Sequence, residues 1–435
     1  MIKGYRLIII GAGPAGLSAA LGAGGIKDIL LIDRNPDPGG LLRQCIHTGF
    51  GHRFFGEDLT GPECAERLVL SAGAAGVDIM TDTSVINISH NKVVTVAGQE
   101  GICEFRTEAL ILASGCRERA IGSLPVCGTR PAGVFPAGSV QKMINIGGYD
   151  VGDRIVILGS GDVGLIAARR LTLEGKKVLA VIEKENECGG LMFNKLMCLD
   201  AFGIPLLTQS TVSELYGSER LTGVRICPAG EEKSYDIECD TLVTSLGLIP
   251  ETDLLRGLDR QDLPWIFVCG NARAVSRFAD DVIADGKTAG ENAAAYLRDG
   301  RASFVPPPSI YPPEDESNFV CLFCPKSCAL KIEKGVVSGG LCREQDLFIS
   351  RDFKSVKFSL TATVKTEDGK RLPVRTSDRI PLADFTGIMT ELKGVTVSGN
   401  VSQGQAIISD VCGKGTDIIA TTSIDQRTLP GFSRI

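Results

Sequence analysis

The sequence has no excess of positive charge and few histidines. Its 46 lysines and arginines are outnumbered by 52 aspartates and glutamates, which gives a net charge of −6 at pH 7. Nucleic acids and anionic membranes both favour basic protein surfaces, so the charge balance gives no support to either as a partner. The three histidines leave few imidazoles for proton transfer near neutral pH.

The chain also lacks a segment that resembles a cleavable signal peptide. Its 15 cysteines are odd in number and mostly scattered, so a secreted disulfide scaffold is not expected. The uncharged run Leu7–Ile26 has the length of a membrane span, but it contains six glycines and Pro14 interrupts it. We expect a strand, a glycine turn and a buried helix there, no transmembrane segment, and a reducing cytoplasm as the location.

Glycine, in contrast, is abundant, with 52 residues. Short apolar runs alternate with helical stretches over the first half of the chain, and this alternation predicts an α/β fold with mostly parallel sheets. The expected strands are short and rich in β-branched residues or leucine: Arg6–Ile10, Asp28–Ile32, Ala109–Leu112, Arg154–Leu158, Lys177–Ile182 and Thr241–Thr244.

A glycine-rich fingerprint follows the first of these strands. Gly11, Gly13 and Gly16 form G-x-G-x-x-G before an apolar helix, and Asp33 ends the next strand. In such a motif the glycines allow a tight turn, the approach of a pyrophosphate, and close packing of helix on strand. The helix N-terminus attracts phosphate and the acid is placed to bind a ribose hydroxyl. The pattern predicts a dinucleotide site, and a glycine-rich packing turn is the structural alternative.

A second fingerprint lies about 150 residues further along the chain. Gly159, Gly161 and Gly164 follow a strand, and Glu183 ends the next one. A carboxylate there accepts hydrogen bonds from ribose hydroxyls and repels a 2′-phosphate, so we expect NAD rather than NADP. The neighbouring Lys184 weakens this preference. A degenerate domain that serves only as a scaffold is the alternative.

Over residues 5–300 the chain resembles the two-dinucleotide-binding-domain flavoproteins, the broad family of thioredoxin reductase. The resemblance rests on five separated motifs: GAGPAG, PGGLLRQC, TEALILASG, CDTLVTSLGLIPET and WIFVCGNA. It implies FAD at the first fingerprint and a nicotinamide nucleotide at the second. The family's usual aspartate in the last motif is Asn271 here, which can still hydrogen-bond FAD but adds no charge.

These patterns and the resemblance assign two sets of residues and two Rossmann-like domains, each with three layers. The FAD set comprises Gly11, Gly13, Pro14, Ala15, Gly16, Asp33, Arg34, Gly40, Gln44, Val85, Ser114, Gly115, Gly270 and Asn271. The NAD set comprises Gly159, Gly161, Asp162, Val163, Gly164, Glu183 and Gly247. The FAD-binding domain is expected over residues 1–145 and 248–300, and the NAD-binding domain over residues 146–247.

The disulfide reductases of this family carry two cysteines against the flavin, and the sequence has neither of their arrangements. Only Cys45 follows Gly40 closely, and Cys188 and Cys198 are ten positions apart. Cys45 is either a buried thiol or a redox-active one, as in relatives that reduce oxygen, peroxide or coenzyme A disulfide. His47, in the same loop, is a candidate to bond the flavin edge or shuttle its proton, with a structural role as the alternative.

A proline-rich linker over residues 301–318 precedes a small, mainly β, cysteine-rich domain over residues 319–435. Four of its cysteines have the spacing of a metal site: Cys321, Cys324, Cys328 and Cys342. Zinc ribbons usually pair two C-x2-C knuckles and only one is present. The C-x2-C-x3-C run with a later fourth cysteine resembles the N-terminal cluster domain of molybdopterin oxidoreductases, which implies a 4Fe–4S cluster. Zinc and free thiols are the alternatives.

The segment GGLLRQCIHTGFG is similar to flavoprotein partners in anaerobic glycerol-3-phosphate-dehydrogenase-type complexes and in opine or proline dehydrogenases. This similarity implies an FAD-dependent, NAD-linked subunit that relays electrons between nicotinamide, flavin and a 4Fe–4S cluster, with a partner dehydrogenase subunit that acts on glycerol 3-phosphate or a similar small metabolite. A stand-alone NADH oxidase, peroxidase or coenzyme A-disulfide reductase that uses Cys45 is one alternative. A non-catalytic nucleotide-binding scaffold is the other.

Overall fold

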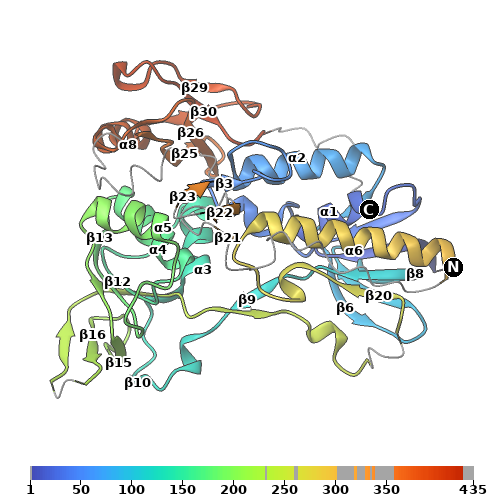
Figure 1. Cartoon of the computed structure of the whole chain (residues 1–435), viewed down its shortest axis with the longest axis horizontal. Helices are drawn as coiled ribbons and strands as arrows, with labels where there is room; N and C mark the ends of the chain where they lie inside the picture. The colour runs from blue at the N-terminus through green and yellow to red at the C-terminus, as the bar shows by residue number, and fades with distance from the viewer. Residues whose placement is uncertain are drawn as a thin grey trace.

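The computed structural model describes residues 2–230, 233–258, 263–300 and 357–424, and the backbone of three short strands at 318–320, 329–333 and 336–338. The described residues form two α/β units and a smaller C-terminal unit that packs against both of them (Figure 1). The three short strands, β21 (Asn318–Val320), β22 (Ala329–Glu333) and β23 (Val336–Ser338), form an antiparallel sheet.

The first unit is built on a seven-stranded sheet of order β5-β2-β1-β8-β7-β6, with β20 paired to β8. Its strands are β1 (Lys3–Ile10), β2 (Ile29–Ile32), β5 (Asp78–Met80), β6 (Ser84–Ile88), β7 (Val93–Gly98), β8 (Gly101–Leu112) and β20 (Ile266–Val268). Because β1 pairs in parallel with β2 and β8, the carboxyl ends of these three strands meet at one edge of the sheet. The first fingerprint begins at this edge.

Three helices cover one face of this sheet: α1 (Pro14–Gly22), α2 (Gly61–Ala74) and α6 (Ala279–Asp299) (Figure 1). Glycines let α1 and α6 approach each other closely. A Cβ atom at Gly286 would lie 2.1 Å from the carbonyl oxygen of Ala15, and one at Gly290 would lie 2.0 Å from that of Ala19. This packing fixes the helix that begins at the first fingerprint.

The second unit has a parallel five-stranded sheet of order β11-β18-β12-β13-β14. Its strands are β11 (Val134–Pro136), β12 (Arg154–Leu158), β13 (Lys177–Ile182), β14 (Leu206–Leu207) and β18 (Thr241–Thr244). One face carries the helices α3 (Ala137–Lys142), η3 (Met143–Gly147), α4 (Asp162–Leu173) and α5 (Met192–Cys198). The other face carries a second sheet with β10 (Cys127–Gly128), β15 (Ser210–Tyr216), β16 (Gly223–Pro228) and β17 (Tyr235–Ile237), so the unit has three layers.

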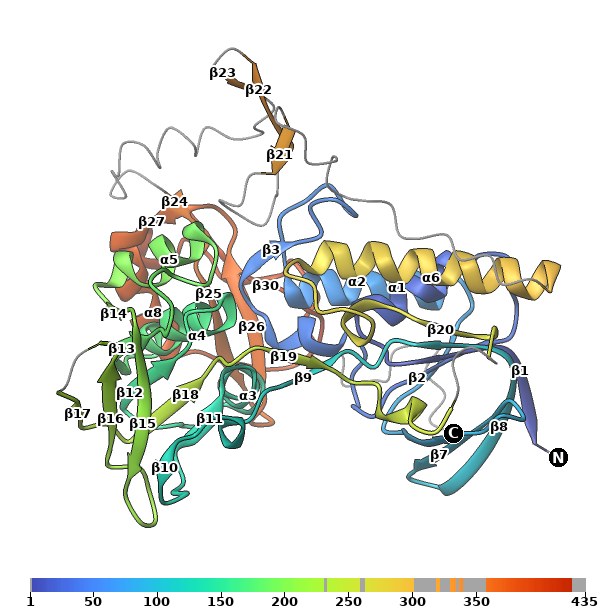
Figure 2. The same ribbon diagram turned by 60° about the horizontal axis from the view of Figure 1, so that its bottom comes forward.

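Two antiparallel strands join the two α/β units. They are β9 (Cys116–Glu118) and β19 (Leu248–Pro250), which run side by side between the units in Figure 2. A short hairpin of β3 (Thr48–Phe50) and β4 (Leu59–Thr60) leads into α2. The loop before β3 lies next to the second unit, because the Gln44 side chain donates to the carbonyl oxygen of Gly138 in α3 at 2.9 Å.

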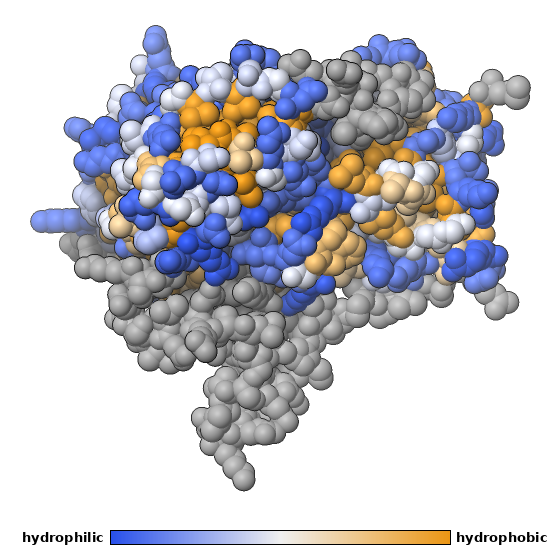
Figure 3. All heavy atoms as spheres, turned by 90° about the horizontal axis from the view of Figure 1, so that it is seen from above, coloured by the Kyte–Doolittle hydropathy of each residue, from blue (hydrophilic) through white to orange (hydrophobic). Residues whose placement is uncertain are grey.

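The C-terminal unit is a five-stranded sheet of order β28-β25-β26-β30-β29 with one helix. Its elements are β24 (Lys357–Phe358), β25 (Thr361–Thr366), β26 (Arg371–Thr376), β27 (Ile380–Pro381), α8 (Phe385–Lys393), β28 (Thr396–Val397), β29 (Ala406–Ile408) and β30 (Ile418–Ala420). It packs on α2, where Arg375 contacts Glu63 at 3.0 Å and Glu66 accepts hydrogen bonds from Thr422 and Ser423. On the face seen in Figure 3 the hydrophobic residues gather in separate areas with hydrophilic residues between them.

The predicted fold class is confirmed: Rossmann-type parallel sheets are followed by a small, mostly β unit. The uncharged N-terminal run forms β1 and α1, as expected. None of the helices in the described ranges is long and apolar enough to cross a membrane.

Candidate functional site

The loop of the first fingerprint is shaped so that only glycine fits at its ends. Gly11 has φ = +103°, and a Cβ atom there would lie 2.4 Å from the carbonyl oxygen of Ala113, while one at Gly16 would overlap the carbonyl oxygen of Gly11. Gly13 differs, since the nearest atom to its Cβ position is the Cα of Gly40, at 3.9 Å. The backbone at Gly13 is therefore open to a ligand, as the approach of a pyrophosphate requires.

Asp33 is held over this loop by its own hydrogen bonds. Its side chain is 8% exposed, Oδ2 accepts from the amide of Ala12 at 2.7 Å, and Oδ1 accepts from the amide of Asn35 at 2.8 Å. The carboxylate lies at the end of β2, next to the loop that the fingerprint forms after β1. This geometry fits an acid that receives a ribose hydroxyl, with lone pairs left over for it.

The second fingerprint repeats the arrangement. A Cβ atom at Gly159 would lie 2.1 Å from the carbonyl oxygen of Ser245. Glu183 accepts hydrogen bonds from the amide of Ser160 at 2.9 Å and from its hydroxyl at 2.6 Å. Burial alone would raise the pKa of Glu183, but the hydrogen bonds from Ser160 and from the amide of Glu185 outweigh it and lower the pKa below the ordinary value. The carboxylate is therefore ionised at neutral pH.

A glycine pair follows the acid of each fingerprint at the same spacing. Gly39 and Gly40 come six and seven residues after Asp33, and Gly189 and Gly190 have the same spacing after Glu183. The amide of Gly39 donates to the carbonyl oxygen of Ala12 at 2.7 Å, and that of Gly189 donates to the Ser160 hydroxyl at 2.7 Å. Sequence reasoning missed the second pair, although its spacing from the acid was visible.

Four further residues predicted for FAD, Ser114, Gly115, Gly270 and Asn271, lie after the end of β8 or before the start of α6. The Ser114 hydroxyl donates to the carbonyl oxygen of Glu251 at 2.5 Å, which ties the β8 end to the strand pair between the units. The amide of Gly270 donates to Asp285 at 2.7 Å. Asp285 lies on α6 and was missed by sequence reasoning. Its carboxylate, also paired with Arg273 at 2.8 Å, supplies negative charge beside the glycine that precedes Asn271.

Asn271 itself is occupied within the protein. Its Oδ1 accepts from the amide of Ser276 at 2.9 Å, and its Nδ2 lies 3.6 Å from the Cys116 sulfur. Of two other predicted FAD residues, the Arg34 side chain is exposed and Val85 is half-buried on β6. The start of β6 lies next to the acid of the fingerprint, because the amide of Thr83 donates to the carbonyl oxygen of Asp33 at 3.0 Å.

The remaining residues predicted for NAD surround the start of α4. Asp162 begins the helix, and its carboxylate accepts from the amide of Leu191 at 2.7 Å and from the Asn194 side chain at 2.8 Å. Val163 follows it in the first turn, and Gly247 lies in the loop after β18 with φ = +90°. These contacts tie the first turn of α4 to the start of α5.

Cys45 and His47 are half-buried, two residues apart in the loop after Gly40. The Cys45 thiol lies 3.9 Å from Oε1 of Gln141, and burial raises its pKa to about 12. Burial also lowers the pKa of His47, to which the positive charge of Arg169 contributes. Since a carbonyl can only accept, the 2.8 Å contact between Nδ1 of His47 and the Thr48 carbonyl places the proton on Nδ1 and leaves Nε2 as an acceptor.

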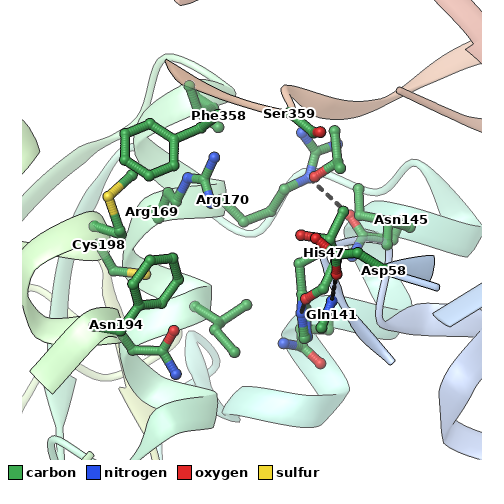
Figure 4. A pocket seen from close by; sticks show the side chains of 18 of the residues that line it. His47, Asp58, Gln141, Asn145, Arg169, Arg170, Asn194, Cys198, Phe358 and Ser359 are labelled. Atoms are coloured by element: carbon green, nitrogen blue, oxygen red, sulfur yellow. Dashed lines mark hydrogen bonds between the residues drawn. The ribbon is translucent and has the colours of Figure 1, made fainter. Parts of the chain in front are cut away.

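A cavity of about 130 Å³ opens beside this loop, between the three units of the chain. Figure 4 shows His47, Asp58, Gln141 and Asn145 on one side of it and Asn194, Cys198 and Phe358 on the other, with Arg169 and Arg170 between them. Neither arginine was singled out from the sequence. Apolar side chains such as Ile166, Phe193 and Met197 also line the cavity. A partly enclosed, mainly apolar cavity with a few polar groups is typical of a small-molecule site.

The cysteines predicted to bind a cluster, Cys321, Cys324, Cys328 and Cys342, lie outside the described residues. Within the parts of the chain that are described, no group of three or more His, Cys, Asp or Glu residues is arranged to hold a metal ion, and the eleven described cysteines are all free. Cys45, Cys188 and Cys198 are thus not joined in a disulfide.

Comparisons with known proteins agree with this geometry. Thioredoxin reductase of Listeria monocytogenes is 26% identical over 324 residues, which cover 69% of this chain and 96% of that protein. Hydrogen cyanide synthase subunit HcnB of Pseudomonas aeruginosa is 29% identical over 277 residues, 58% of this chain and 59% of that protein. An opine oxidase subunit of Agrobacterium tumefaciens is 27% identical, and the match covers 58% of this chain and 54% of that protein.

Solved structures share the fold. The thioredoxin reductase of T. acidophilum superposes with a TM-score of 0.54 at 22% identity and covers 68% of this chain and 98% of its own. An NAD-dependent persulfide reductase from A. fulgidus superposes with a TM-score of 0.51 at 16% identity and covers 85% of this chain and 70% of its own. At these identities the likeness concerns the fold alone.

Two family matches divide the chain. Residues 347–422 match a protein family of unknown function, DUF1667. Residues 5–268, more than half of the chain, match the pyridine nucleotide-disulphide oxidoreductases, and both fingerprints lie in this range. The chain therefore belongs to the pyridine nucleotide-disulphide oxidoreductase family and is an FAD-dependent NAD(P)H oxidoreductase.

Proposed function

We propose that this oxidoreductase uses NAD(H) at the second fingerprint and relays electrons between nicotinamide, flavin and a 4Fe–4S cluster, as one component of a larger multisubunit dehydrogenase. The observation that carries the proposal is the state of Cys45. It is the only cysteine in the loop after Gly40, and among the described residues the one polar partner of its thiol is Gln141. A flavoprotein without a dithiol beside its flavin needs another electron acceptor.

The residues of the two fingerprints fit the nucleotides that the family uses. A Cβ atom at Gly40 would lie 2.8 Å from the Cα of Gly13, so the two glycine loops can lie this close together only because Gly40 has no side chain. Gly13 and the N-terminus of α1 would hold the FAD pyrophosphate, and Asp33 its ribose. Bound there, FAD supplies the ability to exchange electron pairs with nicotinamide and single electrons with a cluster.

Glu183 supports NAD as the nucleotide of the second site. Its pKa is low, so a full negative charge stands where the 2′-phosphate of NADP would have to lie. Lys184, the nearest cation in sequence, is exposed and pairs with Glu185 at 3.1 Å. The positive charge of Lys184 is thereby partly compensated and offers little to a 2′-phosphate.

The relatives support a role within a complex. Two of them, the hydrogen cyanide synthase and opine oxidase proteins, are named as subunits. By analogy, a partner protein would oxidise a small metabolite such as glycerol 3-phosphate, and Cys321, Cys324, Cys328 and Cys342 would hold the cluster through which electrons pass. The residues allow electron flow in either direction.

Anaerobic purification of the full chain tests this proposal. We expect about four iron and four sulfide per chain, an electron paramagnetic resonance signal after reduction with NADH, and loss of both in Cys324→Ser. Cys412→Ser removes an exposed cysteine of the C-terminal unit outside the C-x2-C-x3-C run and serves as the control. Zinc in place of iron, or a flavin that NADH does not reduce, would contradict the relay.

A further inference from the structure

Three parts of the chain line the cavity beside Cys45 and His47. The loop from Ile46 to Gly49 forms one wall, helices α3, η3, α4 and α5 form a second, and residues 358–361 of the C-terminal unit close it (Figure 4). The cavity of about 130 Å³ is close in size to an engineered cavity of ~150 Å³ that holds benzene, so a molecule of about six non-hydrogen atoms fits.

Arg169 brings an uncompensated charge to this cavity. Its Nε and Nη2 atoms are both buried and have no hydrogen-bond acceptor among the described residues. These two atoms form one edge of the guanidinium, the edge that binds a carboxylate through two parallel hydrogen bonds. The guanidinium lies 5.7 Å from the ring centre of Phe385, and this contact offsets part of the free-energy cost of burying the charge. Burial lowers the pKa of Arg169.

Arg170 adds a further donor. Its side chain is 6% exposed, and its Nη1 atom is buried without an acceptor among the residues that the structure describes. The charge of Arg170 is already balanced by Glu174, at 2.6 Å. Among the described residues that line the cavity, Asp58 is the one acid, and it is engaged with His52 at 3.2 Å and with Arg379 at 3.5 Å. Within the described part of the lining, the positive charge of Arg169 is therefore left without an opposite charge.

The pyrophosphate of the dinucleotide is not the anion that would balance the charge of Arg169. Arg169 lies near the C-terminal end of α4, eight residues beyond Gly161. At 1.5 Å per residue, this separates it from the N-terminus of the helix by about 12 Å. A pyrophosphate at the fingerprint and an anion in the cavity would occupy two different places.

We propose that the cavity binds a small organic acid as a monoanionic carboxylate, which Arg169 holds through its Nε and Nη2 atoms and Arg170 through Nη1. The Nε2 atom of His47 can accept a hydrogen bond from a hydroxyl or amino group of the same molecule. A single negative charge matches the single unbalanced cation, and a planar carboxylate matches the planar edge. This site goes beyond the electron relay and does not depend on the cluster or on a partner protein.

Two measurements on the full chain test the site: thermal unfolding and calorimetric titration. Both use sodium L-lactate and sodium acetate in a buffer free of chloride and phosphate. We expect L-lactate to bind and to raise the melting temperature, because a ligand that binds only the folded state stabilises it. Lactamide, which has the same shape without the charge, should not bind. Arg169→Met should weaken lactate binding at least tenfold, and Arg169→Lys, which keeps the charge but not the two-donor edge, should weaken it less.

Arg225→Met is the matched control, since Arg225 lies on β16, pairs with Asp236 at 2.9 Å and does not line the cavity. We expect this variant to bind lactate like the unmodified chain. Arg169→Met should also melt at a higher temperature than the unmodified chain without ligand, because it removes an unpaired buried charge. Three results would overturn the proposal: equal lactate binding by Arg169→Met, binding of inorganic phosphate but of neither carboxylate, or a parallel loss of NADH binding in Arg169→Met, which would assign the arginine to the dinucleotide.

Discussion

The Nε atom of Arg170 donates a hydrogen bond to Oδ1 of Asn145 at 2.8 Å, and both side chains are buried. Asn145 in turn donates through Nδ2 to the carbonyl oxygen of Gln44 at 2.9 Å. Arg170 also contacts Thr363 of the C-terminal unit at 3.3 Å. A single amide thus links the loop of the first unit, helix α4 of the second and, through Arg170, the C-terminal unit.

The first prediction concerns this link. Asn145→Leu leaves the Nε atom of Arg170 buried without an acceptor, and the Gln44 carbonyl oxygen keeps only its hydrogen bond from the amide of Ile46, at 3.1 Å. An unpaired buried group costs about 1–3 kcal/mol. We expect a lower melting temperature in calorimetry. Asn87→Ala, which truncates an exposed side chain on β6, should change the free energy of unfolding by less than about 0.5 kcal/mol. Equal stability of the two variants would mean that the link does not hold the units together.

The second prediction separates the relay from an oxidase or peroxidase that uses Cys45. The burial that raises the pKa of Cys45 to about 12 keeps the thiol protonated, whereas peroxide chemistry requires a thiolate. Cys45→Ser should therefore reduce its flavin with NADH at a rate within about twofold of the unmodified chain in stopped-flow absorbance. A sulfenic acid trapped at Cys45 after treatment with peroxide would favour the oxidase instead.

The third prediction concerns the choice of nucleotide. Glu183→Ala removes the charge that repels a 2′-phosphate and leaves the amide of Ser160 without its acceptor. We expect the KM for NADH to rise about tenfold or more, as the loss of a charged hydrogen bond of about 1.5–3 kcal/mol implies, while discrimination against NADPH shrinks. Glu187→Ala, on an exposed side chain four residues later, should keep both values. An unchanged NADH/NADPH ratio in Glu183→Ala would remove the basis for the NAD assignment.

Much of the fold could be predicted from the sequence, because buried parallel strands correspond to short runs rich in β-branched residues. The runs at 154–158, 177–182 and 241–244 coincide with β12, β13 and β18. Helix α8 was missed, although its buried side chains Phe385, Ile388, Met389 and Leu392 follow helical spacing. With nine residues, the helix is too short for its helical periodicity to be distinguished from the alternating pattern of the neighbouring strands.

The parts of the candidate site whose residues are close in sequence could be predicted. The parts that form only when distant segments pack together could not. The glycine fingerprints and their acids lie close together in sequence, and the structure brings each set together. Arg169 and Arg170 belong to a helix whose sequence gives no sign of burial, since arginines near a helix end are usually solvated. The C-terminal unit, which lies some 190 residues further along the chain, contributes to their burial, since Arg170 contacts Thr363 and Arg169 lies over the Phe385 ring.

The last prediction uses the pH dependence of stability. Burial, assisted by Arg169 on α4, lowers the pKa of His47. The Thr48 carbonyl, Asp162 and Asp58 act in the opposite direction without reversing the shift. Because the folded pKa lies below the unfolded value of about 6.5, the unfolded chain takes up the proton first as the pH falls, and stability is lost below that pH.

His47→Gln should therefore lose less stability than the unmodified chain between about pH 7 and pH 5, in urea unfolding curves at a series of pH values. His90→Gln, which changes a histidine outside the cavity lining, is the control and should follow the unmodified chain. If all three proteins lose stability in parallel, His47 is protonated equally in the folded and unfolded chain. An imidazole that stays neutral in the folded protein is also what the lactate site requires, because only then can Nε2 accept a hydrogen bond.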